Sequence, residues 1–487
     1  MRIIGNNPQL SRQTQGTASG AITGGKPVLV NTDGTVTQIT EVVAGFGSEA
    51  VFESATANFV AATFDSNSNK VVIGYGDGGN SGYGTAVVAT IDSSDNSVSY
   101  GTPVVFVSGE VKYLSATFDS NTNRVVMSYR NDTSGDNGFS VVGSVSGTGI
   151  SFGTPVTFNS GGSSTNFVAS AFDSSNNKIV IAYQDGNNSS YGTAIVGTVD
   201  SSDNSISFGS EAVFESASSQ EIAITFDSSN NKVVIAYKDS GNSSAGTAIV
   251  GTVSGTSISF GSASTFDTSS STDGITATFD SSNNKVFLAY QDGGNSNYGT
   301  AVIGTVSGTS ISFGSEVVYN SGNSVSKDAT FDTNNNKVVL VFLDHGNSRG
   351  QVILGTVSGT GVSFSSATTY DEATVLYNQV VFDSSTNKLL VAYYDAGNSN
   401  YGTARVFAPA VPTNITSENF IGFAEDTVAT GQPVTVNTKG AIDENQSSLT
   451  PAQQYFVQTD GTLGTSADDP SVVAGTAVTA TKLIVKG

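Results

Sequence analysis

The chain of 487 residues has no cysteine, no tryptophan and a single histidine, His345. The lack of cysteine excludes disulfides and thiolate chemistry, and one histidine cannot build a multi-histidine zinc site. Charged residues make up only 12%, and the formal net charge of −22 disfavours nucleic-acid binding. No apolar run is long enough for a secretory signal or a membrane span. We therefore expect a protein made in a cytoplasm that neither binds nucleic acid nor inserts into a membrane.

An internal repeat dominates the middle of the chain. A Phe-Asp pair recurs at spacings of 54 residues that shorten to 51, and its phenylalanines are Phe64, Phe118, Phe172, Phe226, Phe279, Phe331 and Phe382. In the third copy, strand-like runs cover residues 167–172, 178–183, 193–199 and 205–214. Four antiparallel strands in each of seven copies predict an all-β fold, a seven-bladed β-propeller. A linear solenoid would need polar capping repeats, which the sequence does not show.

The seventh copy lacks its fourth strand. Residues 403–407 are followed by Pro409 and Pro412, and the missing pattern occurs before the first copy, where residues 45–53 nearly repeat residues 208–215. We therefore expect an N-terminal strand to complete the last blade and close the ring. Closure also removes the open sheet edges that favour aggregation.

The two ends of the chain resemble each other. Residues 25–34 parallel residues 431–440, and Asp460-Gly461 has the signature of a tight hairpin. We expect three parts: residues 1–43, an N-terminal arm and part of a terminal β module; residues 44–407, the propeller; and residues 408–487, the rest of that module. Residues 6–20 are polar and are expected to lie against a partner.

The C-terminal residues also carry a family resemblance. Residues 449–463 and 471–485 resemble a module of tailed-phage structural proteins, and residues 6–13 and 24–28 look like the start of marine phage virion proteins. The repeat motif Tyr-x-Asp-x-Gly-Asn-Ser-x-Tyr-Gly-Thr-Ala is similar to repeats of such phages. The resemblance implies a virion surface protein, made in the host cytoplasm, that contacts capsid or tail proteins as a homo-oligomer or as symmetry-bound copies. A receptor-binding tail-fibre lectin and a glycan-degrading enzyme are the alternatives.

Acidic residues recur in one loop of most copies. They are Asp77, Asp185, Asp239, Asp292, Asp344 and Asp395. Each loop offers one carboxylate, whereas calcium usually takes more than one. We therefore interpret these residues as turn-forming aspartates and predict no metal site.

Tyrosines follow these loops in alternate copies. They are Tyr83, Tyr191, Tyr298 and Tyr401, and the repeat should place them on one face of the ring. Aromatic rings flanked by Asn and Ser suit sugar binding, which makes host-surface polysaccharide a candidate ligand. The alternative is that these tyrosines pack on neighbouring loops or are solvated.

We predict no catalytic residue and no cofactor. A glycosidase needs two placed carboxylates, and the acids recur in every blade as turn residues. His345 lies in a repeat loop and is interpreted as a solvated residue. The basic residues Arg2, Arg12 and Lys26 lie near the N-terminus of an acidic chain, and they are candidates for docking to another virion protein.

Overall fold

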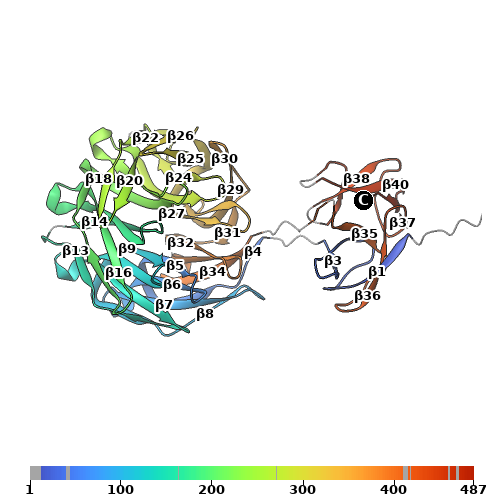
Figure 1. Cartoon of the computed structure of the whole chain (residues 1–487), viewed down its shortest axis with the longest axis horizontal. Helices are drawn as coiled ribbons and strands as arrows, with labels where there is room; N and C mark the ends of the chain where they lie inside the picture. The colour runs from blue at the N-terminus through green and yellow to red at the C-terminus, as the bar shows by residue number, and fades with distance from the viewer. Residues whose placement is uncertain are drawn as a thin grey trace, which may run out of the picture. The chain divides into compact units, whose positions relative to one another are not determined.

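The computed structural model describes residues 12–39, 44–162, 164–269, 271–409, 415–416, 418–458, 461–467 and 471–486. The chain is all-β with antiparallel sheets, and it divides into two compact units (Figure 1). We call Phe46–Ala408 the repeat unit, and Met1–Gly45 together with Pro409–Gly487 the terminal unit. Among the described residues, no helix has the length and apolar character needed to cross a membrane.

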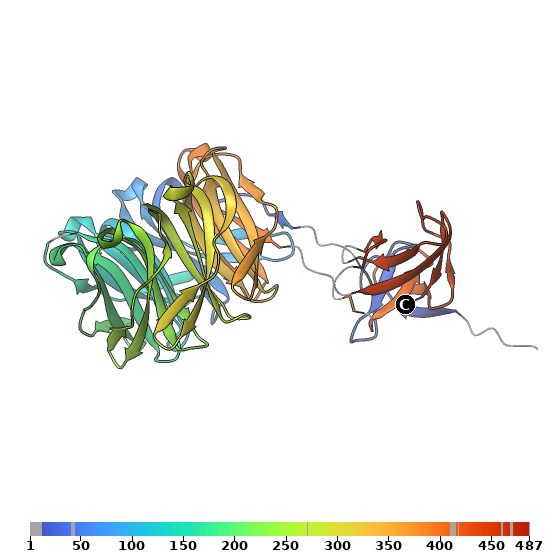
Figure 2. The same cartoon turned by 90° about the horizontal axis from the view of Figure 1, so that it is seen from above.

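The third copy shows the order of strands in the repeat unit. β14 (Thr165–Asp173), β15 (Lys178–Asp185), β16 (Tyr191–Asp200) and β17 (Ser205–Phe208) pair antiparallel in sequence order. The middle strands β15 and β16 are almost wholly buried, because Val and Ile fill both of their faces. Figure 2 shows these long strands packed side by side around the repeat unit.

The other copies repeat this order. The first two copies contain β5 (Ala50–Asp65), β6 (Lys70–Asp77), β7 (Tyr83–Asp92), β8 (Ser97–Tyr100), β9 (Val104–Asp119), β10 (Arg124–Asn131), β11 (Asn137–Ser146) and β12 (Gly149–Phe152). β13 (Val156–Asn159) precedes the third copy, and the fourth contains β18 (Ala212–Asp227), β19 (Lys232–Asp239), β20 (Ala245–Ser254) and β21 (Ser257–Phe260).

The last three copies follow the same plan. They contain β22 (Ser264–Asp267), β23 (Thr272–Asp280), β24 (Lys285–Asp292), β25 (Tyr298–Ser307), β26 (Ser310–Phe313), β27 (Val317–Asp332), β28 (Lys337–Asp344), β29 (Arg349–Ser358), β30 (Gly361–Phe364), β31 (Thr368–Asp371), β32 (Val375–Asp383), β33 (Lys388–Asp395) and β34 (Tyr401–Ala408).

The strand expected over residues 205–214 is interrupted. β17 ends at Phe208 and β18 begins at Ala212, and both segments pair with β16. The break occurs at Gly209, where an added Cβ would lie 1.9 Å from the carbonyl oxygen of Thr256 in the next copy. The backbone bends because the neighbouring hairpin occupies that space. β18 then continues for 16 residues and becomes the first strand of the fourth copy.

The segment before the first copy pairs with the last strand of the seventh. β5 and β34 run antiparallel, with Ala50 opposite Ala404 and Val51 opposite Thr403. Arg405 lies where the other copies hold Val or Ile, and its Nε and Nη2 donate to the carbonyl oxygen of Gly47 at 3.1 and 3.0 Å. This arginine therefore binds the joining segment directly.

Seven aromatic pairs form the repeated core, and their ring centroids lie 5.1–5.3 Å apart. The pairs are Phe52–Tyr75, Phe106–Tyr129, Phe158–Tyr183, Phe214–Tyr237, Phe266–Tyr290, Tyr319–Phe342 and Tyr370–Tyr393. Each buries an aromatic ring against the strand that follows, so large apolar area is removed from water once per copy. The first pair includes Phe52 from the joining segment.

The Phe-Asp pairs end the first strand of each copy in a tight hairpin. In the third copy, the Asp173 carboxylate accepts hydrogen bonds from the backbone N–H groups of Ser175 and Asn176 at 2.9 and 3.0 Å. Asn177 then takes a positive φ of 54°, which Asn tolerates better than most residues. The invariant spacing of Asp and Asn within the copies thus has a local conformational cause.

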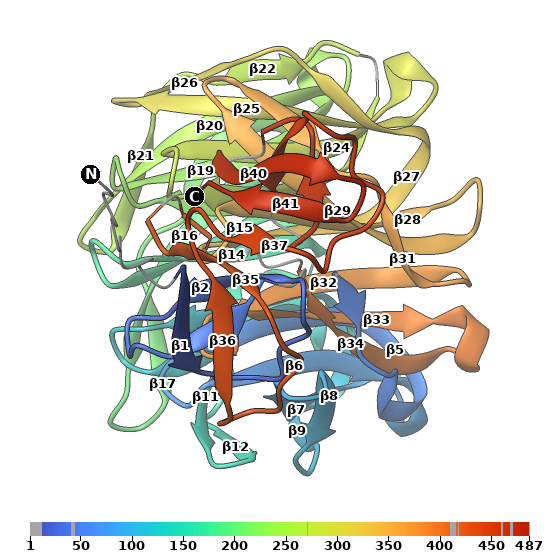
Figure 3. The ribbon, with the colours of Figure 1, turned by 90° about the vertical axis from the view of Figure 1, so that its right-hand side faces the viewer.

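The terminal unit contains two five-stranded sheets. The first orders β1 (Gln13–Thr17), β36 (Pro433–Asn437), β35 (Phe420–Ala424), β2 (Pro27–Val30) and β3 (Val36–Gln38). The second orders β37 (Ile442–Asp443), β41 (Lys482–Val485), β40 (Val472–Thr479), β38 (Gln454–Val457) and β39 (Leu463–Gly464). Figure 3 shows β1 beside β36 and β40 beside β41.

Both ends of the chain contribute to the core of the terminal unit. Leu29 and Ile39 pack in one buried cluster with Phe423, Val457 and Leu483. Of residues 6–20, which are expected to lie against a partner, residues 13–17 form β1 and pair with β36 of the same chain, so contact with another protein stays a prediction. The polar side chains of β1 suit this place, since a strand at the edge of a sheet keeps one side in water.

Candidate functional site

The recurring loop aspartates cap short turns. Asp77, Asp185, Asp239, Asp292 and Asp395 each precede a 3₁₀ helix and accept a hydrogen bond from its backbone N–H groups. The helices are η1 (Gly78–Asn80), η3 (Gly186–Asn188), η4 (Ser240–Asn242), η5 (Gly293–Asn295) and η6 (Ala396–Asn398), and Asn131 caps η2 (Asp132–Ser134) in the same way.

Asp344 caps its loop differently. It has no 3₁₀ helix after it, and its carboxylate accepts instead from Asn347 Nδ2 at 2.6 Å. His345 follows it in an exposed turn, and the His345 backbone N–H donates to the carbonyl oxygen of Asn323 at 2.9 Å. The carboxylates of these loops are thus engaged in local turn structure.

The four loop tyrosines occupy equivalent places. Each is half-buried and opens the third strand of its copy: Tyr83 in β7, Tyr191 in β16, Tyr298 in β25 and Tyr401 in β34. Each lies opposite the capping aspartate on one side and the first strand of the following copy on the other. Along the chain each is separated from the next by a copy without a tyrosine there, but Tyr401 and Tyr83 lie in adjoining copies because β34 pairs with β5.

The predicted docking residues lie in the terminal unit. Arg2 is outside the described residues. Arg12 donates from Nη1 to the carbonyl oxygen of Gly440 at 2.6 Å, so it joins the first strand to the turn after β36. The Lys26 side chain is exposed, while its backbone carbonyl accepts from Ala424 N at 2.9 Å. Whether these residues touch another protein stays a prediction.

A cavity of about 500 Å³ is lined by the first strand of every copy. At one repeat position, two residues before the Phe of each Phe-Asp pair, the lining contains Ala62, Ala116, Ser170, Ile224, Ala277, Ala329 and Val380. Most copies contribute small or apolar side chains, and only the sixth places two charged residues, Lys327 and Asp328, in succession. This volume is within the range of small-ligand sites.

A set of bulge residues, one in each copy, precedes the cavity-lining residues along the first strand, and we call this set the mouth. In each copy it precedes the first cavity-lining residue by one to three positions. The mouth residues are Phe59, Tyr113, Phe167, Glu221, Gly274, Ser326 and Tyr377. Each falls where the pairing of the first and second strands slips, so its side chain leaves the regular alternation of the strand.

Four mouth residues form a continuous aromatic arc: Tyr377, Phe59, Tyr113 and Phe167. Their ring centroids are 4.9, 5.7 and 5.2 Å apart in that order, with interplanar angles of 40–50°. The Arg130 guanidinium lies 5.1 Å from the centroid of Tyr113. All four rings are half-buried, so part of each remains open at the mouth.

The polar side of the mouth is formed by copies four to six. Glu221 Oε2 accepts from Gly274 N at 3.0 Å, and Lys327 Nζ donates to the carbonyl oxygen of Gly274 at 2.9 Å. Lys238 Nζ forms an ion pair with Asp273 at 2.6 Å. Burial raises the pKa of Glu221. Burial lowers the pKa of Lys327 to about 7, although the neighbouring acids Glu221 and Asp273 act to raise it. Burial raises the pKa of Asp328 to about 6.

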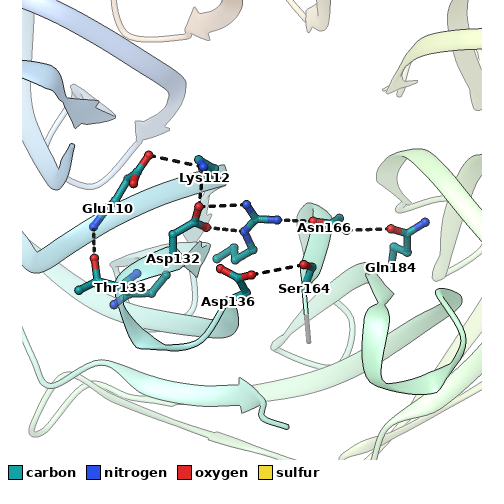
Figure 4. Close-up of polar contacts among 10 residues, drawn as sticks. Glu110, Lys112, Asp132, Thr133, Asp136, Ser164, Asn166 and Gln184 are labelled. Carbon is teal, nitrogen blue, oxygen red and sulfur yellow. Dashed lines mark hydrogen bonds and ion pairs between the residues drawn. The ribbon is translucent and has the colours of Figure 1, made fainter. Parts of the chain in front are cut away.

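Polar side chains of copies two and three form a network of hydrogen bonds and ion pairs (Figure 4). Asp132 binds Lys112 Nζ and Arg130 Nε, both at 2.5 Å. Arg130 also donates to Asn166, whose Nδ2 donates to Gln184 Oε1 at 2.9 Å. The network therefore links copies two and three through side chains that flank Tyr113 and Phe167.

Sequence reasoning missed the mouth. The signal was present, because each mouth residue lies five positions before the Phe of a Phe-Asp pair. Four copies hold an aromatic residue there and three hold Glu, Gly or Ser. The loop tyrosines were easier to see because they sit inside the most regular part of the motif.

The buried charges make stability depend on pH. The pKa of Lys327 is below its unfolded value, so the unfolded chain binds more protons between about pH 7 and 10.5. Stability linked to this lysine should therefore rise across that window and be lowest below it. We expect Lys327→Leu, which restores the apolar residue typical of this position, to remove that rise. Chemical unfolding of both proteins at pH 7 and pH 10 measures it, and equal pH dependence would contradict the assignment.

No family model and no curated protein matches this chain. Similar solved structures include a protein of unknown function from Dyadobacter fermentans, with 14% identity and a TM-score of 0.44 over 76% of this chain and 100% of that one. AofleA from Arthrobotrys oligospora has 9% identity and a TM-score of 0.42, covering 72% and 96%. The NanB sialidase from Streptococcus pneumoniae has 12% identity and a TM-score of 0.41, covering 75% and 70%. Similarity this low transfers no residue role to the present chain.

Proposed function

We propose that this chain is a non-enzymatic structural protein on the surface of a tailed-phage particle, built as a seven-bladed β-propeller on a terminal β unit. The terminal unit attaches the chain to capsid or tail proteins of the virion. The propeller is exposed and offers a surface to host polysaccharide. The protein is made in the host cytoplasm and is carried on the particle in symmetry-bound copies.

The lining of the cavity supports the proposed propeller fold. All seven copies contribute the same part of their first strand to its wall, as expected for blades arranged around a central axis. The pairing of β5 with β34 joins the first copy to the last. Gly47 packs against the Asn96 turn as Gly209 packs against the Thr256 turn, so the joining contact repeats the contact between internal copies.

The terminal unit is built from both ends of the chain, and this observation carries the proposal that the unit attaches the protein to the virion. Both ends of the chain leave the repeat unit and fold together into a separate unit with its own core. Residues 449–463 and 471–485, which resemble a tailed-phage module, supply β38, β39, β40 and β41 of one sheet. A propeller held at both ends by one such unit is suited to display from a larger assembly.

The use of the acidic residues favours a non-enzymatic role. The loop aspartates cap turns in copy after copy, and the acids beside Lys112, Lys238 and Arg130 are held in ion pairs. No group of three or more His, Asp or Glu residues in the described part of the chain is placed to hold a metal ion. A binding role, unlike acid–base catalysis, does not require any of these carboxylates to change its protonation state.

Immunogold labelling of purified particles tests this proposal. One antibody is raised against the repeat unit and one against the terminal unit. We expect the first to label intact particles, and the second to label them only after disruption, because the terminal unit faces the virion. Equal labelling of intact particles by both antibodies would reject attachment through the terminal unit. Lack of labelling before and after disruption would reject the virion role.

A further inference from the structure

The aromatic residues of the mouth are not required by the fold. The same bulge holds Glu221, Gly274 and Ser326 in the three copies opposite the arc, and the strands pair there in the same way. Every mouth residue, including Glu221, Gly274 and Ser326, adopts a positive φ of 45–55°. This conformation is unfavourable for bulky side chains, and such strain is often kept where a side chain serves a function.

The arc offers a curved apolar surface of the size of a few sugar rings. The contacts from Tyr377 through Phe59 and Tyr113 to Phe167 leave no break between neighbouring rings. Aromatic faces pack well against the C–H groups of a saccharide, and side-chain amides beside them can bond its hydroxyl groups. Asn166 precedes Phe167 of the arc and is half-buried, so it supplies such an amide, which Gln184 orients by accepting from its Nδ2.

The charges around the mouth select against a charged ligand. Lys112 and Arg130 share Asp132, and Lys238 is paired with Asp273. Lys327 donates to the Gly274 carbonyl and lies close enough to Glu221 and Asp273 for both acids to raise its pKa. A carboxylate or sulfate on the ligand would compete with these acids for the lysines and the arginine. An uncharged ligand keeps every pair intact.

We infer that the mouth of the cavity is a binding site for a neutral saccharide, which stacks on the arc of Tyr377, Phe59, Tyr113 and Phe167. Hydroxyl groups of the ligand bond Asn166 and the polar side of the mouth at Glu221 and Lys327. The inference deepens the proposed contact with host polysaccharide, and it places that contact at the cavity and not on the loop tyrosines.

Calorimetric titration of the full chain tests the site. The probes are maltotetraose, cellotetraose and tetra-N-acetylchitotetraose, with tetragalacturonate as the anionic counterpart. We expect at least one neutral probe to bind and tetragalacturonate to bind more weakly. Phe59→Ser and Tyr113→Ser each reproduce the residue that the sixth copy carries at this bulge. Each should weaken binding by about fivefold to tenfold, the value of one aromatic contact.

The matched control is the pair Tyr83→Ser and Tyr191→Ser, which removes loop tyrosines and leaves the arc whole. Unchanged thermal unfolding shows that each variant is folded. Binding lost in the loop variants and kept in the arc variants would overturn the inference, as would the absence of binding by every neutral probe. A chain that is present on particles but binds no probe refutes this site alone. A chain that binds but is absent from particles refutes the proposed virion role alone.

Discussion

Phe52→Ala is expected to lower the free energy of unfolding of the repeat unit by about 3–5 kcal/mol, the usual cost of removing a buried aromatic ring. Phe52 lies in the segment that joins the last copy to the first, and it is only 6% exposed. Its ring contacts Tyr75 and Tyr100 and covers Gly402, where an added Cβ would lie 2.3 Å from it. The mutation would leave a cavity where the last copy of the repeat is joined to the first.

Two further variants make the comparison decisive. Phe214→Ala removes the equivalent ring from an internal copy, where it contacts Tyr237 and Phe260. Val51→Ala changes the residue before Phe52, and the Val51 side chain is 41% exposed. Denaturant unfolding should give the two Phe variants similar losses and Val51→Ala a small one. If Phe52→Ala were as mild as Val51→Ala, the joining segment would not be part of the core.

Gly422→Ala is expected to unfold the terminal unit while the repeat unit stays folded. Gly422 has a φ of +143°, which L side chains rarely adopt, and an added Cβ would lie 1.9 Å from the carbonyl oxygen of Asn437. The obstacle is backbone in the paired strand β36, so it cannot rotate away. Strain and lost pairing together should cost about 3 kcal/mol or more.

Scanning calorimetry measures this effect because the chain has two compact units. We expect the transition of the terminal unit to move to lower temperature or disappear, and that of the repeat unit to keep its Tm. Gly20→Ala is the control, since nothing lies within 4 Å of the added Cβ. A Gly422→Ala protein with both transitions unchanged would contradict the described packing of β35 against β36.

Much of the fold could be predicted because the repeat carries its own local rules. The Asp173–Asn177 turn and the alternating strands are encoded within a few residues, and seven copies reinforce the pattern. The match of residues 45–53 to residues 208–215 predicted the pairing that β5 and β34 make. The break at Gly209 was not predicted, because its cause is the Thr256 carbonyl of another copy. The blade count and the virion role stay proposals.

The mouth was harder to predict because it depends on departures from the repeat. Phe59 and Ser326 occupy the same repeat position, and a pattern search averages such differences away. The pairing of Lys327 with the Gly274 carbonyl also joins separate copies. The slip of register that turns these side chains toward the mouth has no clear sequence signal, since bulges are set by the strands packed beside them.

Quantitative mass spectrometry of purified particles tests the central claim most directly. The chain is measured against the major capsid protein of the virus whose genome encodes it. The account predicts that the chain is present in a fixed ratio to the capsid protein that does not fall on further purification. A ratio near one would favour a head location, and a much lower fixed ratio the tail. Absence of the chain from purified particles would contradict the account.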